Sequence, residues 1–357
     1  MSRLFEETTI GTVRTANRIA MAPMTRNRAN ADGTATDIMA EYYGQRSTAA
    51  LIITEGIQPS HVGQGYAGTP GLHTEEHVES WKPVVKAARA DGAAVFAQIM
   101  HAGRVGHPSV KGHQPVAPSP VPAPGQIYTP EGMQDNVVPR ELTHEEILDI
   151  IQEHVTAARY AVEAGFDGVE IHGANGYLIQ QFLSDNVNRR TDEWGGSVEG
   201  RIKFAVEVVR AVAEAIGPER TALRVSPGSP TQGIEEGDSR ELYLALLPAL
   251  ADLPLAYLHV MEVAGNRELT KELRAAWPHT LVLNPHRDAE GGLEPHEAGH
   301  DALEDVGADV VAFGWSFLAN PDLPARLATQ GPYTQGDHAT FFGGDHVGYL
   351  DYPTLQK

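Results

Sequence analysis

Short apolar runs alternate with longer amphipathic segments along almost the whole chain. Runs that are apolar throughout and rich in β-branched residues are typical of strands buried on both faces of a parallel sheet, with helices as the crossovers. We expect eight such strands, at Arg18–Met24, Ala50–Gly56, Ala94–Met100, Gly168–His172, Thr221–Ser226, Ala256–Met261, Thr280–Asn284 and Val310–Gly314. Eight strands close a TIM barrel, so the pattern predicts an α/β fold in which residues 1–357 form a single (β/α)8 barrel domain.

The clearest helix is predicted from Thr143 to Gly165. Thr143 and Glu146 have the spacing of a capping box, and the apolar residues that follow recur at the helical period. Gly165 suits the left-handed position that ends many helices. The segment is therefore predicted to form one long amphipathic helix.

Two segments depart from plain barrel spacing. Thr8 to Asn17 contains a Gly-Thr turn and predicts a hairpin that covers the barrel bottom before the first strand. The stretch from His107 to Pro139, after the third strand, holds so many prolines that we expect neither a helix nor a central strand there. We expect it to be a loop insertion that walls a site.

Composition narrows the function classes. With 357 residues and 41% hydrophobic residues, the chain can bury a large core, and the formal charge of −20 argues against a nucleic-acid or anionic-membrane partner. Cysteine is absent, which excludes disulfides, thiolate nucleophiles and cysteine-ligated metal clusters. The chain begins with no signal-peptide pattern and contains no apolar stretch of spanning length, so we expect a cytoplasmic protein. Composition leaves the oligomeric state open.

Polar residues stand where several predicted strands end, which is the active-site face of a TIM barrel. The set includes Thr25, Gln98, His172 and Arg224. It offers no nucleophile paired with a base, no metal-binding His-x-x-x-His helix and no phosphate-binding P-loop, so no metal site is expected. Thr, Gln and Arg side chains suit the edge of a planar heterocycle, and hydride chemistry requires a cofactor of that kind.

The most informative cluster follows the fourth predicted strand. His172, Asn175 and Tyr177 bring two hydrogen-bond donors and a phenol together within six residues. Such a cluster suits holding a carbonyl or nitro oxygen while a proton is delivered beside it.

These residues belong to a series of motifs that resembles the old yellow enzyme family of flavin-dependent ene-reductases over nearly the whole chain. The matching blocks are Ala22–Arg26, Glu41–Arg46, Gly65–His73, Gln98–Arg104, Glu170–Tyr177, Arg224–Pro227 and Ala319–Leu323. The resemblance implies a tightly bound, non-covalent FMN and NADPH or NADH as reductant. It implies hydride transfer through FMN N5 in a ping-pong reaction that reduces the activated C=C bond of α,β-unsaturated carbonyl compounds, with nitro compounds or nitrate esters as further substrates.

The resemblance also implies roles for individual residues. His172 and Asn175 would hold the substrate oxygen, and Tyr177 would protonate the α-carbon. The remaining expected substrate contacts are Tyr66, Met100 and Tyr349. The expected cofactor contacts are Pro23, Met24, Thr25, Gly56, Gln98, His172, Arg224, Asn284, His286, Arg287, Gly314 and Trp315.

The chain departs from the commonest family pattern in four places. Asn175 stands where many relatives have a second His, and it also donates through its amide. Met100 replaces a Trp of several relatives and should open the substrate pocket. Trp315 stands where relatives usually have the Arg that binds the FMN phosphate, and 284–287 replaces a Gly-rich turn. His286 or Arg287, with the backbone amides of Gly314 and Trp315, would then hold the phosphate.

Two other functions remain open at this stage. A glycosidase barrel with Glu55 and Glu170 as its carboxylate pair would fit the fold but leaves Thr25, Gln98 and Arg224 unexplained. We expect Glu170 to pair with an Arg or His inside the barrel instead. A flavin-binding carrier without turnover would hold FMN that NADPH cannot bleach.

Overall fold

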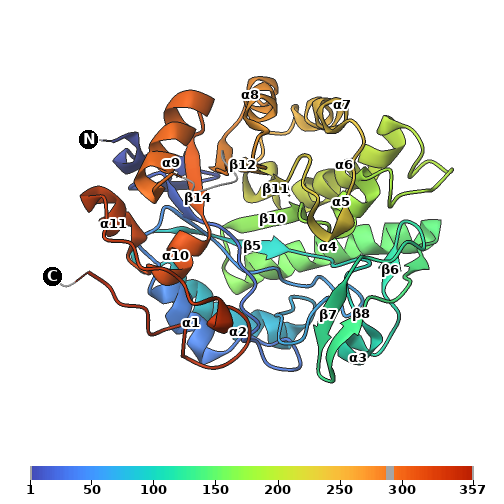
Figure 1. Ribbon diagram of the computed structural model, residues 1–357, viewed down its shortest axis with the longest axis horizontal. Helices are drawn as coiled ribbons and strands as arrows, with labels where there is room; N and C mark the ends of the chain where they lie inside the picture. Colours follow the sequence, from blue (N-terminus) through green and yellow to red (C-terminus); the bar gives the residue numbers. More distant parts are fainter. Residues whose placement is uncertain (1, 287–292, 356–357) are drawn as a thin grey trace.

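The computed structural model describes residues 2–286 and 293–355 and contains a closed barrel of eight parallel strands surrounded by helices (Figure 1). The order around the barrel is β10-β11-β12-β13-β14-β3-β4-β5, and β5 pairs with β10 to close it. The barrel strands are β3 Ile19–Met21, β4 Leu51–Ile53, β5 Ala94–Ile99, β10 Gly168–Gly173, β11 Thr221–Val225, β12 Tyr257–Met261, β13 Leu281–Asn284 and β14 Val310–Phe313. Each predicted strand is confirmed, with its ends shifted by a few residues.

The bottom of the barrel is closed by an N-terminal hairpin, as predicted. Strands β1 (Thr8–Ile10) and β2 (Val13–Thr15) pair antiparallel. Ile10 is fully buried in a cluster with small and aromatic residues from the barrel strands, among them Ala20 and Tyr257. The opposite, carboxyl ends of the strands are therefore left to form the site.

The predicted long helix is also confirmed and is α4 (His144–Ala164). The backbone N–H of Glu146 donates to Thr143 Oγ1 over 3.2 Å, the Glu146 carboxylate accepts from the Thr143 N–H over 2.9 Å, and Gly165 has φ 99°. The other helices of the barrel are α1 Asp37–Gly44, α2 Glu75–Ala88, α5 Leu178–Leu183, α6 Val198–Ile216, α7 Ser239–Leu246, α8 Arg267–Ala276, α9 Pro295–Asp301, α10 Trp315–Ala319 and α11 Leu323–Thr329.

The proline-rich insertion is more ordered than expected. It carries a single helical turn, α3 (Pro108–Lys111), because a proline is tolerated at the first position of a helix, where its missing N–H is not needed. It also forms the antiparallel hairpin β7 (Gln126–Thr129) and β8 (Gly132–Asp135), seen in green at one edge of Figure 1. The expectation of no helix was thus wrong for one turn, and no segment of the insertion joins the barrel.

The helices between residues 2 and 286 and between 293 and 355 include none with the length and apolar character needed to cross a membrane.

Candidate active site

A cavity of about 900 Å³ opens at the carboxyl ends of the barrel strands. It brings together side chains that are far apart in the sequence, from the end of β3 to the C-terminal segment. The predicted residues that line it are Pro23, Met24, Thr25, Tyr66, Gln98, Met100, His172, Asn175, Tyr177, Arg224 and Trp315. The proline-rich insertion walls one side with Ile127 and Tyr128 of β7, as expected.

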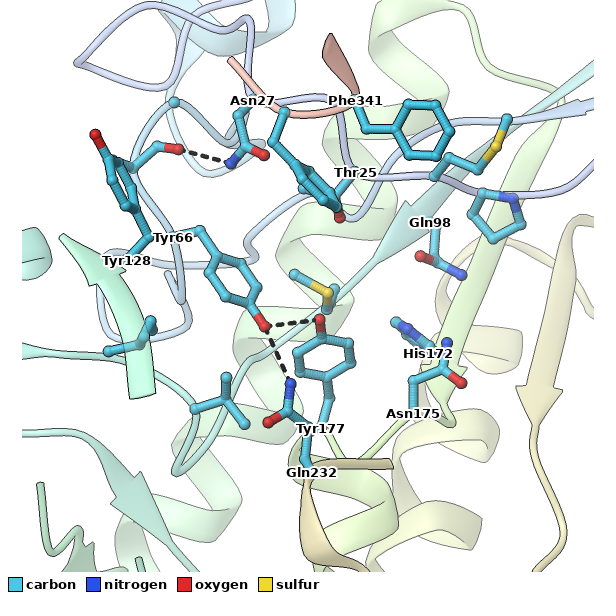
Figure 2. Close-up of a pocket in the computed structure, with 18 of the residues that line it drawn as sticks. Thr25, Asn27, Tyr66, Gln98, Tyr128, His172, Asn175, Tyr177, Gln232 and Phe341 are labelled. Atoms are coloured by element: carbon cyan, nitrogen blue, oxygen red, sulfur yellow. Dashed lines mark hydrogen bonds between the residues drawn. The ribbon is translucent and has the colours of Figure 1, made fainter. Parts of the chain in front are cut away.

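His172 and Asn175 lie next to each other on the cavity wall (Figure 2). Burial, together with Arg224 and His259, holds the pKa of His172 well below its usual range, so the imidazole is neutral at pH 7. Neither the Nδ1 of His172 nor the Oδ1 of Asn175 has a hydrogen-bond partner among the described residues. These two side chains therefore have hydrogen-bonding capacity left for a ligand.

The backbone of Asn175 is held in an unusual conformation. Its φ is 57°, in the left-handed region, and its N–H donates to Ser226 Oγ over 3.0 Å. Asn tolerates this region better than most residues. The turn between β10 and α5 thus lets Asn175 reach the cavity only a few residues after His172.

Tyr177 precedes α5 and lies against His172, with their ring centroids 5.1 Å apart. Its hydroxyl is 3.1 Å from that of Tyr66. Burial, and then the neighbouring Tyr66, raises the pKa of Tyr177 well above its usual range. The phenol therefore keeps its proton at neutral pH and can serve as an acid.

Gln98 and Arg224 lie deeper, on β5 and β11. The Gln98 amide donates to one oxygen of Glu170 over 2.8 Å, and the other oxygen accepts from His259 Nδ1 over 2.8 Å. Glu170 is thus a buried positioning group paired with a histidine, as predicted. Arg224 donates to Asn284 over 3.3 Å, and its Nε has no partner among the described residues.

A second cavity, of about 500 Å³, lies beside the first, and Pro23, Met24, Arg224 and Trp315 line both. Asn284, His286 and Gly314 line only the second, so it brings together the residues expected to hold the cofactor phosphate. Trp315 lies between the two cavities and is 65% exposed.

The second cavity also contains a cation that the sequence did not indicate. Arg267 lines it and donates to Glu262 over 2.7 and 2.9 Å and to Asp301 over 2.6 Å. These carboxylates leave its guanidinium little free charge for an anionic ligand. Arg287, the cation proposed from the sequence, lies outside the described residues, so its role stays a prediction.

Comparison with known proteins decides the family. Residues 3–333 match the model of the NADH:flavin oxidoreductase / NADH oxidase family. The chain belongs to this family, the family of the old yellow enzymes.

Individual relatives match over almost their full length. 12-Oxophytodienoate reductase 2 of Arabidopsis thaliana is 41% identical over 98% of this chain and 94% of that protein. The structure of the old yellow enzyme homologue from Zymomonas mobilis superposes with a TM-score of 0.93 at 40% identity, covering 99% of both chains. Morphinone reductase in complex with tetrahydroNAD superposes with a TM-score of 0.91 at 38% identity, covering 99% of this chain and 98% of that chain.

The old yellow enzyme family binds FMN and takes its electrons from a nicotinamide dinucleotide, and the residues of this chain fit the flavin ring. The buried, unpartnered Nε of Arg224 supplies a positive donor of the kind that the oxygen-rich, electron-accepting edge of the flavin requires. Thr25 and Gln98 line the same cavity. The donor set therefore suits the ring of FMN in the first cavity.

Two expected contacts are corrected by the structure. Tyr349 is fully buried and stacks on Tyr42 with ring centroids 4.1 Å apart, and it is not among the described residues that line the cavity. Arg26 and Arg28 lie over its ring, at 5.0 and 4.3 Å, so the residue packs the C-terminal segment against the barrel. Gly56 is also absent from the described lining of both cavities.

Gly56 has a packing role instead. A Cβ atom at this position would lie 2.6 Å from the Met100 sulfur, so the glycine makes room for the methionine that does line the cavity. Met100 could therefore not keep its place if residue 56 carried a side chain.

Several cavity residues were not predicted. Gln232 lies in the turn after β11, and reading that loop past Ser226 and Pro227 would have suggested it. Phe341 and Phe342 come from the C-terminal segment, where no sequence pattern marks a site.

The glycosidase alternative is not supported by the geometry. Glu55 and Glu170 are both fully buried, and neither is among the described residues that line the two cavities. Burial raises the pKa of Glu55 to about 7, but no substrate can reach it.

Proposed function

We propose that this old yellow enzyme reduces the activated C=C bond of α,β-unsaturated carbonyl compounds at the expense of NADPH or NADH. The observation that carries the proposal is the grouping of His172, Asn175 and Tyr177 on the wall of one cavity, with no hydrogen-bond partner at His172 Nδ1 among the described residues. The names of two similar proteins, 12-oxophytodienoate reductase and morphinone reductase, support the reductase class.

The pair His172 and Asn175, which we call the oxygen clamp, binds the carbonyl oxygen. A neutral imidazole N–H and an amide N–H2 both donate, and the bound oxygen draws electron density from the β-carbon. Because Asn175 does not titrate and His172 stays neutral, the clamp keeps its donors across the neutral pH range.

Bound FMN supplies the hydride chemistry that no side chain provides. Thr25, Gln98 and Arg224 would hold its ring, with backbone contacts from Pro23 and Met24, and Asn284, His286 and Gly314 line the space for its phosphate. Arg224 places a positive charge in this buried site, which favours a cofactor that carries negative charge.

Tyr177 delivers the proton in this account. Its phenolic O–H bond breaks as the C–H bond forms at the α-carbon, and the raised pKa makes the phenol the stable form between turnovers. We also propose nitro compounds and nitrate esters as substrates, because the oxygen clamp binds a nitro oxygen as it binds a carbonyl oxygen.

The test compares two substrate classes in Tyr177→Phe. Alkene reduction requires carbon protonation and should slow strongly, by about 10²-fold or more, since general acid catalysis contributes roughly 10²–10⁴-fold. Nitro reduction requires no carbon protonation in its first step and should be nearly unchanged, as should flavin reduction by NADPH. Equal slowing of both classes in stopped-flow traces would show that Tyr177 shapes the pocket and is not the acid.

A further inference from the structure

Tyr66 and Tyr177 point their hydroxyl groups at each other across the cavity wall (Figure 2). Their oxygens are 3.1 Å apart and their rings meet edge to face, at 86°. The side-chain amide nitrogen of Gln232 lies 3.5 Å from the Tyr66 oxygen on its other side. The three groups thus form a chain that ends at the proposed acid.

The donor and acceptor chemistry of the three groups sets the direction of the hydrogen bonds between them. An amide nitrogen only donates, so the Tyr66 oxygen accepts from Gln232. The Tyr66 hydroxyl hydrogen is then available to the Tyr177 oxygen, which leaves the hydrogen of Tyr177 free for a substrate in the cavity. In the opposite direction, Tyr66 would accept twice and its own hydrogen would be unpaired.

The backbone of Gln232 has an unfavourable conformation that contacts with other residues stabilise. Its φ is 58°, in the left-handed region, which is costly for a residue with a side chain. The Arg104 guanidinium donates to the Gln232 carbonyl over 2.7 Å, and it also binds the carbonyls of Val121 and Pro122 in the proline-rich insertion. Arg104 thus anchors the backbone of Gln232 to the insertion, and the Gln232 side chain extends from this anchored position towards Tyr66.

We propose that Tyr66, backed by Gln232, is a positioning residue for proton delivery: it orients the Tyr177 hydroxyl and donates a hydrogen bond to the Tyr177 oxygen as the proton leaves. The inference rests on the proposed function of Tyr177. The Tyr177 O–H bond breaks, the C–H bond forms at the α-carbon, and the negative charge left on the Tyr177 oxygen is stabilised by the Tyr66 hydroxyl. Water restores the proton after the product departs.

Burial raises the pKa of both phenols, so both keep their protons at neutral pH. Each hydroxyl can therefore donate one hydrogen bond, and the contact of Tyr66 with the Gln232 amide favours donation from Tyr66 to Tyr177. The Tyr66 hydroxyl is then a donor within reach of the charge that develops on the Tyr177 oxygen.

The test is Tyr66→Phe, which keeps the ring and removes the oxygen. The hydrogen bond between Tyr66 and Tyr177 strengthens as charge develops on the Tyr177 oxygen, so its loss should slow alkene reduction in a single anaerobic turnover roughly ten- to a hundredfold. The solvent deuterium isotope effect on that step should rise, because proton transfer becomes more limiting. Nitro reduction should slow far less than alkene reduction, because its first step needs no carbon protonation. Tyr160→Phe is the matched control, since it removes a hydroxyl from α4, outside both cavities.

Two results would overturn the inference. An unchanged alkene rate in Tyr66→Phe would mean that Tyr177 acts without its partner. Equal slowing of alkene and nitro reduction with an unchanged isotope effect would mean that Tyr66 only shapes the cavity. Tyr177→Phe, measured alongside, keeps the two proposals apart, because failure of the proposed function removes the alkene effect from Tyr177→Phe as well.

Discussion

At the scale of single residues, the site works through groups whose charge is held constant. His172 is kept neutral by burial and by the nearby positive charge of Arg224, and Tyr177 is kept protonated by burial. The residue types of His172 and Tyr177 and their spacing in the sequence were enough to predict that both side chains lie in one site. The burial that sets their pKa values comes from contacts between distant segments, so it could not be predicted from the sequence.

Trp315 stands where the resemblance to the family predicts an arginine, and it offers a direct test of the proposed phosphate site. Trp315→Arg should tighten FMN binding by roughly ten- to a hundredfold, because a charge-assisted hydrogen bond contributes about 1.5–3 kcal/mol. Fluorescence titration of the apo-protein measures this. Riboflavin, which lacks the phosphate, should bind Trp315→Arg no more tightly than the wild type.

A Trp315→Phe variant controls for the loss of the indole and should leave the ratio of FMN to riboflavin affinity unchanged. If riboflavin gained as much affinity from Trp315→Arg as FMN did, the arginine would act on the ring or on folding, and the assignment of the second cavity to the phosphate would be wrong.

At the scale of elements, the sequence predicted the barrel strands and α4 because the signals are local. Apolar runs, a capping box and a terminal glycine act over a few neighbouring residues. The contacts that bring Gln232 to Tyr66, or the C-terminal segment to Tyr42, join residues more than a hundred positions apart. No local sequence pattern indicates such contacts. For this reason Gln232 was not predicted to line the cavity, and Tyr349 was predicted to line it although it is buried elsewhere.

The hairpin β7–β8 walls one side of the cavity, and its removal should separate substrate binding from cofactor binding. Replacing residues 126–135 by a short Gly-Ser linker removes Ile127 and Tyr128 from the wall. Loss of this apolar cover should raise KM for a bulky enone by roughly tenfold, since each buried CH₂ contributes about 0.8 kcal/mol. The ring contacts come from barrel strands, so FMN affinity should change little.

Steady-state kinetics of the shortened protein give the KM for the enone, and flavin fluorescence gives its affinity for FMN. If the variant released FMN while its KM for the enone stayed constant, the hairpin would contribute to cofactor binding and not to substrate binding.

At the scale of the whole molecule, buried ionisable groups predict how stability changes with pH. Burial lowers the pKa of His154 to about 4 and holds that of His101 well below its usual range. The unfolded chain takes up these protons below its ordinary pKa of about 6.5, whereas the folded chain does not. The free energy of unfolding should therefore fall as the pH decreases from about 6.5 towards 4.

His154→Leu should make the free energy of unfolding less dependent on pH below about 6.5, because the leucine side chain binds no proton in the folded or the unfolded state. The slope of unfolding free energy between pH 6 and 5 should decrease by up to about 1.4 kcal/mol per pH unit. Urea unfolding followed by circular dichroism at several pH values measures it. Parallel curves for the variant and the wild type would show that His154 is protonated equally in the folded and unfolded chains.

The oxygen clamp activates the substrate in the proposed reaction, and one anaerobic experiment isolates its contribution. The protein is first titrated with NADPH until the flavin absorbance is bleached, and cyclohexenone is then added while the return of the absorbance is recorded. We expect the wild type to bleach and recover. The double variant His172→Ala/Asn175→Ala should still bleach but recover at least about 10²-fold more slowly, since each lost oxyanion-type donor costs about 10²-fold or more. Recovery at the wild-type rate in the double variant would show that His172 and Asn175 do not activate the substrate.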